Sequence, residues 1–257
     1  MKKASIILAI LLSISISVMP CLAHFGMVIP SDSMVMPEDN RTISIAISFS
    51  HPFEGIGMKL SRPGRFMVMV NGKTQELTTG LRQSKVMGEQ AWKLDYKVNR
   101  PGVYTFFMEP EPYWEPAEDC YIIHYTKTAV AAFGSEEGWD DPLGIKTEIV
   151  PLTRPFGLYT GNLFQGVVML NGGPVPYAEV EVEYYNMDGK AEAPTDYMIT
   201  QVLKSDSNGV FSYTVPKAGW WGFAALNMSD EKIKHKGENK DVELGAVIWV
   251  EFHEWKD

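Results

Sequence analysis

The sequence predicts an all-β protein in which two antiparallel β-sandwich domains follow a cleaved signal peptide. Apolar and polar residues alternate through most of the chain, as in strands with one buried face, and no long stretch repeats with the roughly 3.6-residue period of a helix. Turn-forming pairs such as Asn71-Gly72 and Asn208-Gly209 separate these stretches, which indicates short strands joined by tight turns.

Residues 1–23 have the composition of a secretory signal. Lys2 and Lys3 precede an apolar run over residues 6–18, and Cys21-Leu22-Ala23 places small residues before a cut after Ala23. The run is shorter than the roughly 20 apolar residues of a membrane-spanning helix. We therefore expect export to the periplasm or another extracytoplasmic compartment. A lipid-modified Cys21 is the alternative.

The mature chain would contain 257 − 23 = 234 residues, enough for two domains of ordinary size. Loss of the two lysines changes the formal charge from −9 to −11, and this disfavours nucleic-acid binding because the phosphate backbone requires a basic face. Cys120 would be left as the single cysteine, so no intrachain disulfide is expected and the core must stabilise the fold.

The first domain is expected over residues 24–152, and the second over residues 161–257 after a linker that contains Pro151 and Pro155. Apolar residues of two segments in the first domain alternate and share a predicted core face: Ile43, Ile45, Ile47 and Phe49, then Trp92, Leu94, Tyr96 and Val98. In the second domain, Val180 and Val182 are predicted to point inward, and the glutamates that alternate with them outward: Glu179, Glu181 and Glu183.

His24 would be the first residue of the mature chain if the cut falls after Ala23. An N-terminal histidine offers two nitrogen ligands to one metal ion, its amine and its imidazole Nδ1, in a six-membered chelate ring. The amine loses its proton readily because the reference pKa of an α-amino group is near 8.

His51 and His124 are predicted to face the interior of the same domain. His51 continues the alternation that ends in Phe49, and His124 shares parity with Ile122 and Val130. Imidazole nitrogens suit divalent transition metals, so His24, His51 and His124 form the candidate metal site. The alternative for each inward histidine is a hydrogen-bonded core residue.

Other ionisable residues are weaker candidates. His235 lies in a lysine-rich loop and His253 near the C-terminus, and neither is expected to bind metal. Glu54 and Glu118 are the candidates for a carboxylate ligand, whereas most of the acidic, aromatic loops are expected to be solvated. No hydrolase, nucleotide-binding or metalloprotease motif occurs, so we expect no enzymatic activity.

Two resemblances extend this interpretation. The segment over residues 161–252, with "PVPYAEVEV", "DSNGVF" and "AGWWGF", resembles transthyretin-like and carboxypeptidase-regulatory-like modules, which implies an immunoglobulin-like or transthyretin-like sandwich. Segments across the mature chain resemble the DUF4198 family: "AHFGMVIPS", "SHPFEGIGM", "RPGVYTFFMEPEPYWEPAEDCYIIHYTK" and "DVELGAVIWVEF".

The second resemblance implies a function. DUF4198 proteins are described as exported accessory components of energy-coupling-factor (ECF-type) nickel and cobalt uptake systems. It therefore implies binding of Ni²⁺ or Co²⁺ outside the cytoplasmic membrane, with the subunits of such an ABC transporter as partners. The ligand roles of the three histidines remain our inference from the residues. Two other hypotheses stay open: a copper carrier or copper-dependent oxidative enzyme that uses the N-terminal chelate, with Cu²⁺ as the cofactor, and a β-sandwich docking module that binds no metal.

Overall fold

The computed structural model describes residues 23–256, so the predicted signal peptide lies outside the described residues except for Ala23. The predicted all-β fold is confirmed. This part of the chain contains no α-helix, and its only helical segments are the 3₁₀ turns η1 (Thr78–Gly80) and η2 (Asp196–Met198). No helix of residues 23–256 is long and apolar enough to cross a membrane.

The first sheet belongs entirely to the N-terminal half. Its strands are β1 (Phe25–Pro30), β3 (Thr42–His51), β4 (Ile56–Met58), β7 (Arg82–Val86) and β8 (Glu89–Lys97). They lie in the order β1-β3-β8-β7, with β4 paired to β3. Every pairing in this sheet is antiparallel.

The central sheet runs through both halves of the chain. Its strands are β2 (Met34–Val35), β5 (Arg65–Val70), β6 (Lys73–Glu76), β9 (Gly102–Glu109), β10 (Tyr113–Glu115), β11 (Cys120–Ala132), β13 (Leu158–Tyr159), β16 (Glu179–Tyr184), β17 (Gln201–Lys204), β19 (Gly219–Met228) and β22 (Val242–His253). The main order is β17-β16-β19-β22-β11-β9-β5-β6. The two halves meet where β11 and β22 pair in parallel.

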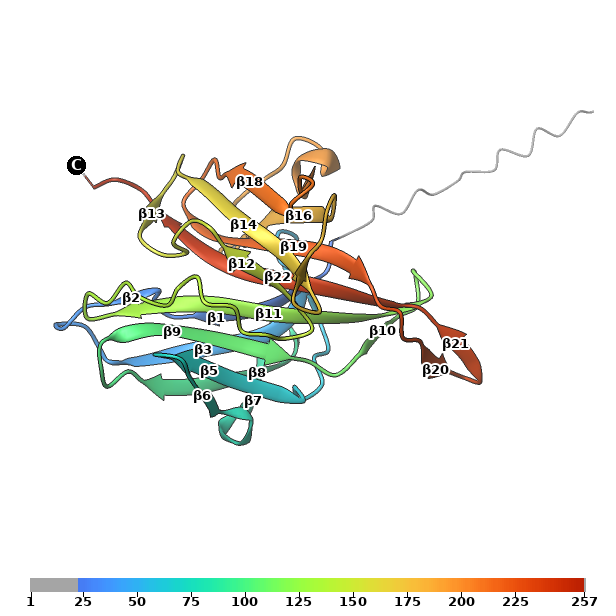
Figure 1. Cartoon of the computed structure of the whole chain (residues 1–257), viewed down its shortest axis with the longest axis horizontal. Coiled ribbons are helices and arrows are strands. Elements are labelled where there is room, and N and C mark those ends of the chain that lie inside the picture. The colour runs from blue at the N-terminus through green and yellow to red at the C-terminus, as the bar shows by residue number, and fades with distance from the viewer. Residues whose placement is uncertain (1–22, 257) are drawn as a thin grey trace, which may run out of the picture.

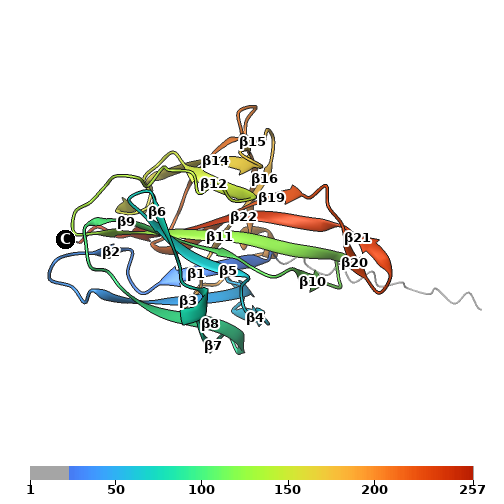
Figure 2. The same ribbon diagram turned by 60° about the horizontal axis from the view of Figure 1, so that its bottom comes forward.

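A third sheet covers the C-terminal half. It contains β12 (Thr147–Pro151), β14 (Leu163–Leu170), β15 (Gly173–Pro174) and β18 (Val210–Thr214). The other three strands each pair antiparallel with β14. Figures 1 and 2 show this sheet on one side of β22 and β11, and β3 and β8 on the other side. A separate hairpin of β20 (Ile233–His235) and β21 (Glu238–Lys240) projects from one end.

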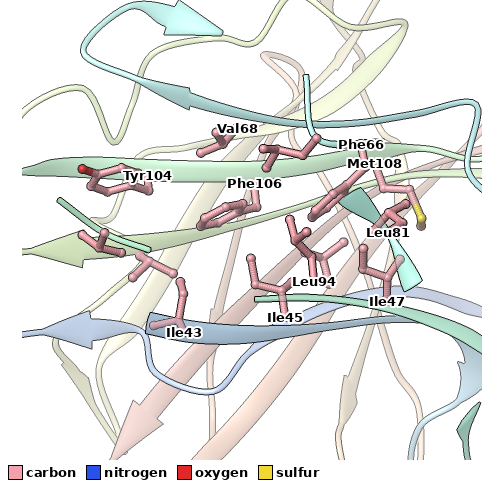
Figure 3. Close-up of a cluster of buried hydrophobic side chains, with 14 of the residues drawn as sticks. Ile43, Ile45, Ile47, Phe66, Val68, Leu81, Leu94, Tyr104, Phe106 and Met108 are labelled. Carbon is pink, nitrogen blue, oxygen red and sulfur yellow. The ribbon is translucent and has the colours of Figure 1, made fainter. Parts of the chain in front are cut away.

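Each half has a hydrophobic core of its own. The first core lies between β3 and the β5–β9 part of the central sheet, where Ile43, Ile45 and Ile47 face Phe66 and Phe106 (Figure 3). These isoleucines confirm the predicted inward face. The second core lies between the central and third sheets. A third hydrophobic cluster joins the two halves. Its residues lie in β1, β19 and β22 or beside them: Ala23, Phe25, Met27, Ile29, Trp220, Ala224, Val247 and Trp249.

Local sequence explains the turns and one departure from expectation. Asn71 and Gly72 both adopt positive φ, which is what a tight hairpin between β5 and β6 requires. Val180 and Val182 are buried as predicted, and Glu183 lies on the opposite face as predicted, but it is only 1% exposed. The face that carries Glu183 is covered by residues after β3, which simple alternation cannot reveal.

The predicted domains, residues 24–152 and 161–257, remain a proposal, as does the transthyretin-like resemblance of the second. β12 lies within the first of these ranges, yet it pairs with β14 and contributes Ile149 to the second core. Of the linker prolines, Pro151 is therefore the last residue of a strand that packs with the C-terminal half, and Pro155 follows that strand.

Candidate metal centre

His24 and His51 are neighbours because of strand register. β1 and β3 pair antiparallel, with Phe25 opposite Ser50. His24 precedes Phe25 and His51 follows Ser50, so the two histidines lie next to each other. The two imidazole rings are 4.7 Å apart between centroids. His51 is buried, and the His24 side chain is 12% exposed. Two of the three predicted ligands are thus in contact at the end of this ladder.

The His51 ring is held by the residue that export would remove. Its Nδ1 lies 2.8 Å from the carbonyl oxygen of Ala23, to which it donates a hydrogen bond. The neutral tautomer that makes this bond carries its lone pair on Nε2. Because amide oxygen and nitrogen atoms are about 2.3 Å apart, the His24 amine created by cleavage would start within about 5 Å of this Nδ1.

Two carboxylates lie beside His24. Glu115 Oε2 is 3.1 Å from His24 Nε2, and Glu118 Oε1 is 3.9 Å from His24 Nδ1. Both residues come from the β10–β11 hairpin, in which Glu115 pairs with Cys120 and Asp119 adopts positive φ in the turn. Partner carboxylates of this kind orient imidazole ligands and increase their basicity.

His124 lies near this pair but has different partners. Its Nδ1 accepts a hydrogen bond from the Gly26 N–H at 3.2 Å, which anchors β1 on β11. Its Nε2 is buried without a hydrogen-bond partner and lies 3.6 Å from Glu243 Oε1. The Phe49 ring contacts both His124 and His24, at centroid distances of 5.5 and 5.8 Å. His124 is therefore inward-facing as predicted, yet it borders the contact pair instead of touching it.

The environment favours neutral imidazole at His24. Burial, together with the positive charges that His51 and His124 would carry, lowers its pKa to about 4, and Glu115 acts in the opposite direction. A metal ligand must be unprotonated, so a low pKa suits binding near neutral pH.

A complete ligand set is not yet present in the uncut chain. Within residues 23–256, no three His, Cys, Asp or Glu side chains are close enough together to hold a metal ion. Cleavage after Ala23 would add one further nitrogen, the amine of His24. The residues fit a metal that binds after processing, when this amine joins the His24 and His51 imidazoles.

The remaining candidates lie elsewhere. Glu54 is near Glu183, and the charge of Glu54 helps to raise the pKa of Glu183. The Glu54 Oε2 atom is buried and has no hydrogen-bond partner among the described residues. His235 stacks on Trp114 at 3.8 Å and bonds the Tyr121 hydroxyl. His253 is the last residue of β22.

Sequence reasoning missed Glu115 and Glu243. Glu115 stands in an acidic, aromatic segment that was expected to be solvated, but the segment forms β10 and Glu115 is buried. Glu243 shares parity with Val247 and Trp249, which pack in the cluster that joins the two halves. Strand parity was the signal that could have identified Glu243.

Comparison with known proteins gives the family. The model of a domain of unknown function, DUF4198, matches residues 21–229. The chain belongs to the DUF4198 family. No curated protein matches this chain.

The similarities to solved structures are weak. Alpha-2-macroglobulin from Escherichia coli has 8% identity and a TM-score of 0.27, covering 90% of this chain and 16% of that one. The mouse nectin-like molecule 4 ectodomain has 13% identity and a TM-score of 0.22, covering 87% and 63%. Fibronectin(III)-like modules of Clostridium thermocellum CbhA have 8% identity and a TM-score of 0.21, covering 90% and 100%. TM-scores this low do not establish a shared fold.

Proposed function

We propose that the mature protein is an exported accessory protein that binds Ni²⁺ or Co²⁺ and supports uptake of the metal by an ECF-type membrane transporter. The observation that carries the proposal is the contact between His24 and His51 at the expected cleavage point, with the Ala23 carbonyl bonded to His51. The choice of nickel or cobalt rests on the resemblance to uptake-system components. The chain itself acts on no substrate in this proposal.

The donor set suits a borderline divalent ion. A processed His24 supplies an amine and an imidazole, His51 supplies a second imidazole, and His124 borders them. No thiolate is available nearby, because burial, together with the negative charges of Glu118 and Glu243, raises the pKa of Cys120 to about 12. Nitrogen ligands without a thiolate allow the reversible capture that delivery to a transporter requires.

The deciding experiment compares the protein that begins at His24 with a variant that has one additional alanine before His24. The additional residue turns the amine into an amide and removes the chelate, while the fold is unchanged. We expect the affinity for Ni²⁺ or Co²⁺ to fall by at least about tenfold, which is about 1.4 kcal/mol. Calorimetric titration measures this, and His253→Ala is the control that should bind like the wild type. Equal affinity of the two proteins would refute the chelate.

Cells provide the functional readout. A strain whose exported protein carries the additional alanine should lose activity of its nickel- or cobalt-dependent enzymes when the metal is scarce. Restoration by excess metal would support a role in uptake, because a high external concentration replaces capture by mass action. Full activity at scarce metal would argue against the uptake role.

A copper protein is the second candidate. One amine and two imidazoles are also ligands that Cu²⁺ accepts, and Cu²⁺ binds a given nitrogen site more tightly than Ni²⁺ or Co²⁺. Affinity alone therefore cannot assign the metal. The metal content of protein matured in its own export pathway would assign it, and peroxide-dependent oxidation of a polysaccharide by the copper-loaded form would favour the enzymatic alternative. Absence of any bound metal would favour a docking module.

A further inference from the structure

The chain directly after His51 is held by the C-terminal half. Glu183 Oε1 accepts a hydrogen bond from the Phe53 N–H at 2.9 Å. Asn186 Nδ2 donates to the Phe53 carbonyl oxygen at 3.1 Å, and the Asn186 N–H donates to the Pro52 carbonyl oxygen at 3.2 Å. Three hydrogen bonds from β16 and the residues after it thus fix the two residues that follow a predicted metal ligand.

Glu183 and Asn186 are themselves fixed in place. The Thr200 hydroxyl donates to Glu183 Oε2 at 2.6 Å. Asn186 forms two hydrogen bonds of 3.0 Å with the backbone of Ala191, one through Oδ1 and one through Nδ2. Both side chains are buried. Rigid supports of this kind hold a site more precisely than a free loop does.

Burial of Glu183 is costly. A carboxylate taken out of water loses hydration, and burial raises the pKa of Glu183 to about 8. Its neighbours on the same strand and face, Glu179 and Glu181, do not share its hydrogen bond from the Phe53 N–H. A group that is expensive to bury and aimed at one loop calls for a role beyond packing.

His51 needs this support after processing. The pairing of β1 with β3 ends at Phe25 and Ser50, so His51 lies beyond that ladder. Its ring bond to the Ala23 carbonyl disappears when Ala23 is removed. The contacts that remain on the backbone are the pairing with β4 at Ile56, the Gly55 N–H bond to the His51 carbonyl, and the contacts through Pro52 and Phe53.

We propose that Glu183 and Asn186 are positioning residues for His51, so that the C-terminal half sets the geometry and affinity of the metal site in the N-terminal half. The inference rests on the proposed function for its effect on metal binding, but its effect on His51 exists in the metal-free protein. The matched control is Glu181, the same residue type two positions away on the same strand.

The test uses full-length mature protein that begins at His24, with Glu183→Ala, Glu183→Gln, Asn186→Ala and Glu181→Ala. Loss of the support should weaken Ni²⁺ affinity by about tenfold or more in Glu183→Ala and Asn186→Ala, as for other residues that orient metal ligands. Glu183→Gln keeps an acceptor for the Phe53 N–H and should bind within about threefold of the wild type, as should Glu181→Ala. If Glu183→Ala does not fold, Asn186→Ala carries the test.

A second readout separates this inference from the proposed function. In the metal-free proteins, the imidazole NMR resonances of His51 should shift, and the Phe53 amide should exchange faster with solvent, in Glu183→Ala and Asn186→Ala only. If the wild type binds no metal, the proposed function fails and these spectra alone decide the inference. Unchanged His51 resonances in both alanine variants would overturn it. So would a wild-type affinity in Asn186→Ala, or a loss in Glu183→Gln equal to that in Glu183→Ala.

Discussion

The Nδ1 atom of His51 lies 2.8 Å from the carbonyl oxygen of Ala23, the residue that precedes the expected cleavage point. In the uncut chain this bond occupies one nitrogen of His51, and the neighbouring nitrogen of His24 is an amide that cannot bind metal. Removal of Ala23 would free both nitrogens in one step. Under the proposed function, export and the creation of the site are therefore the same event.

The first prediction concerns the processed N-terminus. The intact mass of the exported protein should correspond to a chain that begins at His24, because Cys21-Leu22-Ala23 places small residues before the cut. Mass spectrometry of protein from the native export pathway measures this. A chain that starts at another residue, or that carries lipid on Cys21, would remove the amine from the site.

The second prediction ranks the three histidines. His51→Ala should weaken Ni²⁺ or Co²⁺ binding by at least about tenfold, because it removes a ligand in contact with His24. His124→Ala should weaken binding by a smaller factor, since the His124 ring reaches His24 only through Phe49. Calorimetric titration gives the order, with His253→Ala as the control. A larger loss in His124→Ala than in His51→Ala would contradict this arrangement.

The third prediction is a pH dependence of stability that arises from Glu183. Burial raises its pKa from 4.5 to about 8, with smaller contributions from the charges of Glu54 and Glu181, while hydrogen bonds from Thr200 and Phe53 lower it. The folded state therefore holds the proton more tightly than the unfolded state. The stability linked to this group is complete below about pH 4.5 and is lost as the pH rises through 8.

Urea denaturation of the wild type and Glu183→Gln across this range measures the effect. The free energy of unfolding of the variant, relative to the wild type, should increase by at least about 1 kcal/mol between the ends of the range. Glu181, whose pKa burial raises to about 7, titrates in both proteins, so the difference reports Glu183 together with its coupling to Glu181. Glu179→Gln changes an exposed neighbour and should follow the wild type. A constant difference between Glu183→Gln and the wild type would contradict the assignment.

The fourth prediction is that Cys120 is unreactive. Burial first, and then the charges of Glu118 and Glu243, raise the pKa of its thiol to about 12, so the nucleophilic thiolate is scarce near neutral pH. Alkylation by iodoacetamide should be at least about a hundredfold slower in the folded protein than in urea. Mass spectrometry follows the reaction in the chain that begins at His24, which lacks Cys21. Similar rates in the two conditions would count against this environment.

Local patterns predicted the strands well, because their information is periodic. Ile43, Ile45 and Ile47 face the first core as the alternation indicated, and Asn71-Gly72 forms the expected turn. The parallel pairing of β11 with β22 joins segments more than a hundred residues apart, and no local pattern encodes such a pairing. The continuity of the central sheet was therefore not predictable from periodicity.

The candidate site was predictable where it depends on strand parity. His51 and His124 are buried at the inward positions that parity gave them. Glu115 and Glu183 were not identified, because each is buried by a segment from another part of the chain: Glu115 against His24, and Glu183 against Phe53. Burial of a carboxylate by a distant loop is a tertiary effect that composition conceals.

The last prediction concerns where the chain can be divided. The first core is formed by residues between Val28 and Phe133, so a fragment that ends in the loop before β12 should still unfold cooperatively. It should melt at a lower temperature than the full chain, because it loses the pairing of β11 with β22 and the cover that Trp249 and Trp220 give to Phe25 and Met27.

The C-terminal half gives the sharper comparison. A fragment over residues 146–257 retains β12, with its five residue pairs to β14 and the buried Ile149, whereas a fragment over residues 161–257 lacks both. Loss of an edge strand exposes β14 and leaves a cavity in the second core, so the shorter fragment should be less stable by at least about 2 kcal/mol. Thermal unfolding followed by circular dichroism compares the two. Equal stability would place the boundary at the prolines, and the absence of a cooperative transition in every fragment would show that the shared sheet makes the two halves one folding unit.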